Sequence, residues 1–100
     1  MNTNKGKERF INNAIDKMFS LAGHQVSHQD FKRKTIHGHV GYDISEYQQN
    51  EFQRWFLNKI QQDKLVGNQK EAENEFSWFM NSYGLNVVQD EYSELETTTF

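Results

Sequence analysis

The chain has 100 residues, a net charge of −3 and an aromatic share of 14%. Its length allows one small domain with a modest core, and its aromatic content is too high for a disordered chain. The lack of cysteine excludes disulfides, thiol nucleophiles and thiolate metal sites. Residues 1–9 lack an apolar stretch, and no apolar run of about 18 residues exists. We therefore expect a soluble cytoplasmic protein with no membrane partner.

The first predicted helix spans residues 7–22. Its apolar residues recur at steps of three and four, so they lie on one side of a helix while polar residues cover the other side. Gly23 follows the last apolar residue and is expected to end the helix. The apolar side consists of Phe10, Ile11, Ala14, Ile15, Met18, Leu21 and Ala22.

The next stretch is predicted to be a connection followed by a strand. Residues 24–30 are polar and have no period, which is typical of a loop. From residue 34 to residue 44 the period becomes two, so alternate side chains would point to opposite faces of a strand or short hairpin. One face would carry Ile36, Val40, Tyr42 and Ile44, and the other Thr35, His37, His39 and Asp43.

Two aromatic-rich helices are predicted over residues 45–64 and 69–83. Ser45 with Gln48, and Asn68 with Glu71, have the spacing of a capping box at the start of each helix. Each helix has an apolar stripe that must be buried, so we expect the helices to pack against each other. The stripes are Phe52, Trp55, Phe56 and Ile60 in the first helix, and Ala72, Phe76, Phe79, Met80 and Tyr83 in the second.

The last predicted elements are a second strand and a tail. Residues 85–92 contain Val87 and Val88, and we expect them to pair with residues 34–44 in a small antiparallel sheet or hairpin. Residues 93–100 are acidic and rich in threonine, which predicts a flexible tail. The predicted fold is therefore α+β and mainly α, with three amphipathic helices in a single globular domain over residues 1–92.

Two aromatic residues lie off the predicted core stripes. Trp78 projects nearly opposite the stripe of its helix, and Tyr47 is turned away from the stripe of the preceding helix. Because Trp and Tyr are enriched as anchors of protein interfaces, we predict a non-enzymatic module that binds another protein, or a second copy as a homodimer. The alternative is that the first helix or the C-terminal strand covers Trp78 within the monomer. The predicted contact residues are Trp78, Tyr47, Glu71, Asn74, Glu75 and Asn81.

A basic run provides an alternative prediction, which is nucleic-acid binding. Three adjacent cations follow an aromatic residue and precede two histidines, so they could contact phosphates while the ring stacks on a base. The residues of this alternative are Phe31, Lys32, Arg33, Lys34, His37 and His39. A charged strand edge exposed to solvent explains the same run without a ligand.

Histidines raise a further alternative, a His-rich metal-binding domain. Four imidazoles within a short stretch could surround Zn²⁺ or Ni²⁺, with Asp30 or Asp43 as an additional ligand; they are His24, His28, His37 and His39. The spacing matches no closed metal signature, so we predict no metal ligand set and no cofactor. The chain also lacks a nucleophile motif, a phosphate-binding glycine loop and a paired-carboxylate motif, so we expect no catalytic residues.

Charge is distributed unevenly along the chain. Residues 1–64 carry ten Lys/Arg and seven Asp/Glu, whereas residues 65–100 carry one and seven. The acidic C-terminal third favours a basic surface on a partner protein. A short chain that is rich in Asn and Gln and lacks Cys and Pro is similar to accessory proteins of phages and mobile elements. This similarity implies a protein that binds a host protein and inhibits or modulates it.

Overall fold

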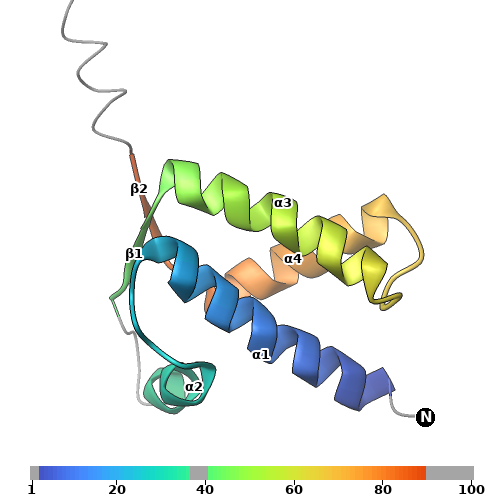
Figure 1. The fold of residues 1–100 in the computed structure, drawn as a ribbon, viewed down its shortest axis with the longest axis horizontal. Coiled ribbons are helices and arrows are strands. Elements are labelled where there is room, and N and C mark those ends of the chain that lie inside the picture. The colour runs from blue at the N-terminus through green and yellow to red at the C-terminus, as the bar shows by residue number, and fades with distance from the viewer. Residues whose placement is uncertain (1–2, 37–40, 90–100) are drawn as a thin grey trace, which may run out of the picture.

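Four helices and two short strands make up the part of the chain that the computed structural model describes, residues 3–36 and 41–89 (Figure 1). The fold is α+β and mainly α, as predicted. None of the helices in these ranges combines the length and the apolar character needed to cross a membrane. In chain order the elements are α1 Thr3–Ala22, α2 His28–Ile36, β1 Asp43–Ser45, α3 Glu46–Gln62, α4 Gln69–Tyr83 and β2 Asn86–Val88.

The three predicted amphipathic helices are confirmed as α1, α3 and α4. The Ser45 Oγ accepts the backbone N–H of Gln48 at 3.1 Å, and the Asn68 Oδ1 accepts that of Glu71 at 2.9 Å, so both predicted helix starts have their N-cap bond. The Glu71 side chain returns to the N–H of Gly67, one residue before the cap. The ends of α1 and α3 have the same C-cap. A residue with positive φ and the residue after it each donate their backbone N–H to a carbonyl in the last turn of the helix. Gly23 has this role at α1, with φ +83°.

Lys64 has the same role at α3, with φ +59°, although it is not a glycine. Its N–H donates to the Gln61 carbonyl at 3.0 Å, and the N–H of Leu65 donates to the Ile60 carbonyl at 3.1 Å. Ile60 and Leu65, which both pack in the core, end up next to each other. The α3 helix therefore ends at Gln62, before the residue 64 that the sequence predicts.

The helix α2 corrects the prediction of a connection over residues 24–30 and a strand that begins at residue 34. Its N-terminus is stabilised by two oxygens: Ser27 Oγ accepts the N–H of Asp30 at 3.2 Å, and Asp16 Oδ1, on α1, accepts the N–H of His28 at 2.9 Å. Phe31 is its buried anchor, only 2% exposed. Residues 37–40 of the predicted strand lie outside the described residues, and only Asp43–Ser45 is a strand.

The two strands pair in parallel, so the predicted antiparallel orientation is wrong. The partners are Asp43 with Asn86, Ile44 with Val87 and Ser45 with Val88. The reason lies in the connection: α3 leads away from β1 and α4 returns beside it, so β2 starts at the same end as β1 and runs in the same direction (Figure 1). The predicted second strand, residues 85–92, is a strand over Asn86–Val88 only, and residues 90–92 are not described.

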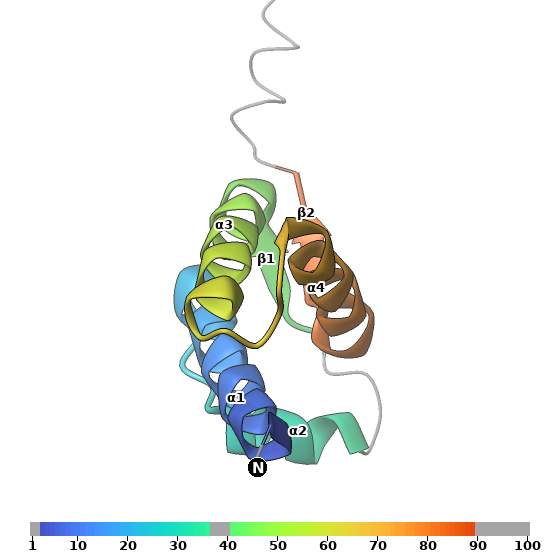
Figure 2. The same ribbon diagram turned by 90° about the vertical axis from the view of Figure 1, so that its right-hand side faces the viewer.

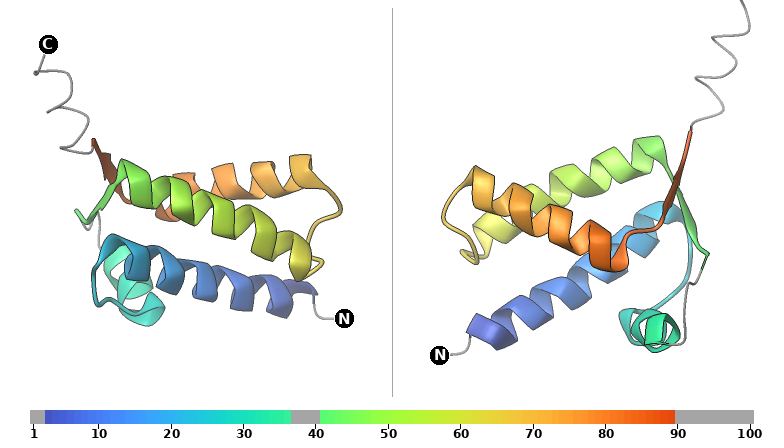
Figure 3. Two further views of the ribbon diagram at one scale, coloured as in Figure 1. Left: turned by 45° about the horizontal axis from the view of Figure 1, so that its top comes forward. Right: turned by 180° about the vertical axis from the view of Figure 1, so that it is seen from behind.

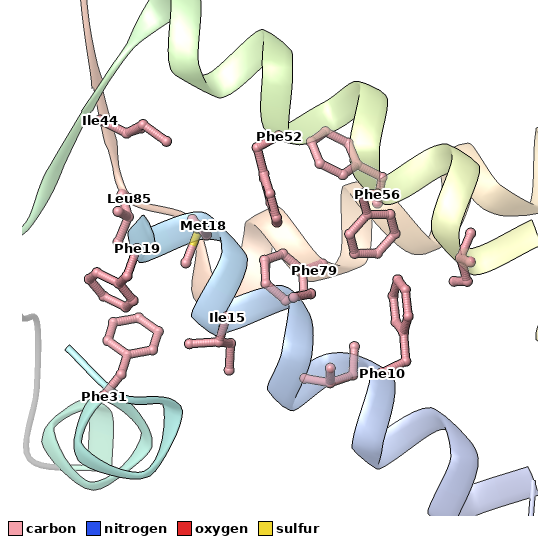
Figure 4. Packing of buried hydrophobic residues seen from close by; sticks show 14 of the residues in the cluster. Phe10, Ile15, Met18, Phe19, Phe31, Ile44, Phe52, Phe56, Phe79 and Leu85 are labelled. Atoms are coloured by element: carbon pink, nitrogen blue, oxygen red, sulfur yellow. The ribbon is translucent and has the colours of Figure 1, made fainter. Parts of the chain in front are cut away.

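The core lies between α1, α3 and α4, with α2 and the strands closing one end. Figure 2 shows α3 and α4 side by side, with α1 beneath them and α2 across the bottom. Phe56 is central, and Figure 4 shows it near Phe10 and Phe79. Its ring centre lies 5.0 Å from that of Phe10, 5.1 Å from that of Phe76 and 5.3 Å from that of Phe79. The predicted stripes thus share one interior, although Trp55 is only half-buried. The fully buried large side chains are Phe10, Ile15, Met18, Phe19, Phe31, Ile44, Phe52, Phe56, Ile60 and Phe79.

Candidate protein-binding surface

Trp78 is the large aromatic side chain on the outer side of α4. The opposite side of this helix buries Ala72, Phe76 and Phe79 in the core. Since Trp78 follows Phe76 by two residues, a helical rotation of about 200° carries its indole out of the core. The residue is 44% exposed, so the rest of the described chain covers about half of it.

Lys7 of α1 covers one side of this indole. Its Nζ lies 5.2 Å from the centre of the Trp78 ring, within the range of a cation–π contact. The same Nζ is 3.1 Å from Oε1 of Glu75, which precedes Trp78 by one helical turn. The Tyr83 ring approaches the indole edge-on, with 6.1 Å between centroids. The indole is therefore held between a cation and a second ring, which fixes its orientation while one side remains in solvent.

A hollow of about 340 Å³ opens beside the indole, and we call it the Trp78 hollow. Its lining residues belong to α1, α2 and α4. The right-hand view of Figure 3 shows these three helices from behind. Its apolar lining comes from Ile11, Trp78 and Tyr83, and charged groups of both signs surround that lining. The full lining is Lys7, Glu8, Ile11, Lys32, Trp78 and Tyr83.

The other predicted contact residues divide into two groups. Asn74 and Asn81 are exposed on α4, as Trp78 is. Glu71 is occupied at the helix start, where its Oε1 accepts the N–H of Gly67 at 2.6 Å, and Glu75 is occupied by Lys7. Tyr47 is 59% exposed but belongs to the first turn of α3, next to the strands. The residues on α4 therefore form one surface, and Tyr47 belongs to a different region.

The structure places the described residues of the predicted nucleic-acid surface on the helix α2, with the aromatic residue in the core. Phe31 is buried, with its ring edge-on to Phe19 at 4.8 Å, so its predicted stacking on a base is wrong. The run is helical, so its cations point in different directions. Lys32 donates to the side chain of Asn12, and only Arg33 and Lys34 are exposed. His37 and His39 lie outside the described residues.

Lys34 illustrates how local contacts occupy this run. Its Nζ donates to the hydroxyl oxygen of Tyr42 at 3.0 Å, and this hydrogen bond raises the pKa of Lys34 above its ordinary value. Arg33 lies 3.6 Å from Asp30, one turn earlier in the same helix. These contacts stabilise α2 and its junction with Tyr42, while the Arg33 side chain remains 72% exposed.

The two described histidines have separate structural partners. His28 Nδ1 is 2.8 Å from Oδ2 of Asp16, and His24 Nε2 is 3.0 Å from the backbone carbonyl oxygen of Asp43. Across residues 3–36 and 41–89, no three His, Cys, Asp or Glu side chains converge as metal ligands. The structure therefore uses His24 and His28 to join α1 to α2 and β1.

Lining residues from α1 and α2, namely Lys7, Ile11 and Lys32, were missed by the sequence prediction. Helical periodicity identifies the outward angle of Trp78 but not which other helix approaches it. Comparisons with known protein families, with curated proteins and with solved structures found no match to this chain. The exposed indole and the hollow beside it are the features of the described chain that point to a function.

Proposed function

We propose that the protein is a small non-enzymatic module that binds another protein through Trp78 and the Trp78 hollow. The single observation that supports this most strongly is the 44% exposure of a tryptophan that other residues hold in place. Tryptophan is among the residues that contribute most to binding energy when a partner buries it. Because part of the indole is exposed to solvent in the free protein, a partner can bury this apolar surface and gain binding free energy.

Preorganisation of the indole supports the same proposal. Lys7 and Tyr83 already restrict the rotamers of Trp78, so little side-chain entropy remains to be lost when a partner binds. A freely rotating surface tryptophan would lose up to about 1 kcal/mol of binding free energy on being ordered. The contacts from α1 therefore make the exposed side of the indole a fixed surface.

The size and lining of the hollow favour a protein over a small molecule. The Trp78 hollow has a volume of about 340 Å³ and is open to solvent. Sites for small ligands, in contrast, usually enclose most of the ligand surface. An apolar centre surrounded by polar and charged groups has the arrangement of a protein interface. One apolar side chain of a partner would fit against Ile11, Trp78 and Tyr83, while Asn74 and Asn81 offer hydrogen bonds at the margin.

The compositional similarity to accessory proteins of phages and mobile elements supports a partner of a particular kind. Such proteins act by binding a host protein and inhibiting or modulating it. We therefore include a host protein as the partner in the proposal. A second copy of this chain is the rival partner, and the experiment below distinguishes the two.

The test uses three tagged proteins as bait in an extract of the host cells: the wild type, Trp78→Ala and Tyr47→Ala. Tyr47→Ala is the matched control, because it also removes an exposed aromatic ring but from another region. We expect a protein to be retained by the wild type and by Tyr47→Ala, and its affinity for Trp78→Ala to fall about 30-fold, the effect of a hot-spot residue. Circular dichroism and thermal unfolding establish that each bait is folded.

Two results would overturn the proposal. Equal retention of every captured protein by the wild type and by folded Trp78→Ala would show that the indole is not an anchor. Concentration-dependent dimerisation of the wild type that Trp78→Ala abolishes, measured by analytical ultracentrifugation, would replace the host protein with a second copy as the partner.

A further inference from the structure

The strand β2 has one hydrogen-bonding edge that β1 does not use. The N–H of Asn86 donates to the Tyr42 carbonyl at 3.0 Å, so the backbone groups of Asn86 face β1. Successive residues of a strand point their N–H and C=O groups to opposite sides. With the observed register, Val88 also faces β1, and the N–H and C=O of Val87 face away from it. We call this side of the strand, centred on Val87, the β2 edge.

The opposite edge of the sheet is occupied. The same alternation directs the carbonyl of Asp43 away from β2, and His24 Nε2 lies 3.0 Å from that oxygen. Ser45 is the N-cap of α3, so the chain leaves the sheet at that point. Side chain and helix thus close the edge of β1, whereas the β2 edge has no such cover among the described residues.

Two exposed apolar side chains lie on β2. Val87 is 51% exposed and Val88 is 43% exposed. Proteins usually protect such an edge with lysine, proline or a covering segment. Residues 84–89 contain no lysine, arginine or proline. The exposed strand therefore retains both the hydrogen-bonding groups and the apolar side chains that another strand needs.

Charge indicates which kind of strand fits. Asp43 and Glu46 are exposed on the segment that pairs with β2, and neither forms an ion pair with another described residue. No lysine or arginine occurs in residues 41–50 either. Asp43 and Glu46 thus place two carboxylates without an ion-pair partner beside the sheet, and Lys34 is occupied by the Tyr42 hydroxyl next to β1. These carboxylates disfavour pairing with a second copy of the same edge and favour a basic segment.

We propose that the β2 edge binds an extended, basic segment of another protein by strand addition. The segment has apolar residues at alternate positions, with Lys or Arg between them. Its backbone exchanges hydrogen bonds with the N–H and C=O of Val87, and its apolar side chains pack on the face of the sheet that carries Val87. Its cations lie on the opposite face, which carries Asp43, with Glu46 at the start of the next helix. This surface is separate from the Trp78 hollow, so the two proposals stand or fall independently.

The test follows the amide of Val87 by NMR in the full chain. In the free protein this amide should exchange with solvent much faster than that of Val88, which is bonded to β1. The probe is a short synthetic peptide in which Lys and Val alternate; the control peptide has Glu in place of each Lys. We expect the Lys/Val peptide to shift and protect the Val87 amide in a saturable manner, and the Glu/Val peptide to have no effect.

A matched pair of variants tests the edge itself. Val87→Pro removes the outward N–H and leaves the N–H donors of Asn86 and Val88 to β1 in place. The affinity for the Lys/Val peptide should therefore fall at least about tenfold. Val87→Thr keeps the N–H and the branched shape, and should bind as the wild type does. Charge is tested separately by the combined variant Asp43→Asn, Glu46→Gln, which should bind more weakly and with less dependence on salt.

Three results would overturn the proposal. Absence of any peptide-induced change at the Val87 amide of the wild type would show that the peptide does not add to β2 as a strand. A Val87 amide that is already protected in dilute free protein would show that this chain covers its own edge. Protection that grows with protein concentration, without peptide, would show that a second copy is the partner.

Discussion

At the scale of single residues, Lys7 connects the N-terminal helix to the candidate surface. Its ammonium contacts the carboxylate of Glu75 and the face of Trp78 at the same time. Both partners lie on α4, one helical turn apart, so Lys7 joins α1 to the indole that Tyr83 contacts from another side. The two contacts are partly exposed, and contacts of this kind contribute about 0.5–1 kcal/mol each at most.

Lys7→Met should therefore loosen Trp78 without unfolding the protein. The methionine keeps an apolar stem beside the indole but removes the charge, so we expect a loss of about 0.5–1 kcal/mol in the free energy of unfolding. The local effect is best measured in a Trp55→Phe background, which leaves Trp78 as the sole tryptophan. Acrylamide should then quench Trp78 more strongly in Lys7→Met than in the control Lys5→Met. Equal quenching in the two variants would contradict the bridging role of Lys7.

At the scale of elements, the sequence predicts α1, α3 and α4 because their signals are local. Apolar residues at steps of three and four define each stripe, and Ser45 and Asn68 mark two of the starts through bonds to residues three positions later. The α2 helix offers no stripe, because Phe31 is the only buried residue among those of the helix whose burial is described. Of the two oxygens at its start, Ser27 Oγ is local, with the spacing of a capping residue, whereas Asp16 lies on another helix. Local patterns report the first contact but not the second.

The dependence of α2 on Asp16 is testable. The carboxylate accepts the N–H of His28 at 2.9 Å and lies 2.8 Å from its Nδ1, so Asp16→Ala should destabilise α2 by about 1 kcal/mol. Hydrogen exchange should accelerate about fivefold in the amides of α2 and remain unchanged in the middle of α3. The control is Asn13→Ala, which replaces an exposed residue of α1 and should leave both helices unaffected. Uniform acceleration in α2 and α3 would show that Asp16 supports the whole fold instead.

The direction of the sheet is a further property that local patterns cannot supply. Alternation predicts a strand at Ile44, and two adjacent valines predict one at Val87, but parallel or antiparallel pairing depends on how the intervening helices bring the chain back. The α3 and α4 helices form an antiparallel pair, which returns β2 to the starting end of β1 (Figure 1). The candidate surface is predictable to the same extent. Helical periodicity within α4 predicts that Trp78 points outward, but it does not predict that Lys7 of α1 approaches the indole.

At the scale of the whole molecule, one aromatic cluster joins all three long helices. Phe56 of α3 contacts Phe10 of α1 and both Phe76 and Phe79 of α4. Each of these rings is almost completely buried. The helices therefore depend on a shared interior, and the loss of one central ring affects every interface at once.

Phe56→Ala should be severely destabilising. Removing a buried phenylalanine lowers the free energy of unfolding by about 3–5 kcal/mol, which is a large part of the 5–15 kcal/mol expected for a small domain. Urea denaturation followed by circular dichroism measures the change. Tyr47→Ala, which removes an exposed ring, should stay within about 0.5 kcal/mol of the wild type. A loss of less than about 1 kcal/mol at Phe56 would contradict its central place in the core.

The parallel pairing of β1 and β2 also determines how this domain bears a mechanical load. The chain enters the sheet at the start of β1 and leaves it at the end of β2, and α3 and α4 connect the two strands in the sequence. Tension between residues 41 and 89 pulls the strands past each other lengthwise, so all the rungs between them are strained together. An antiparallel pair joined by a tight turn would instead peel open one rung at a time, under a smaller force.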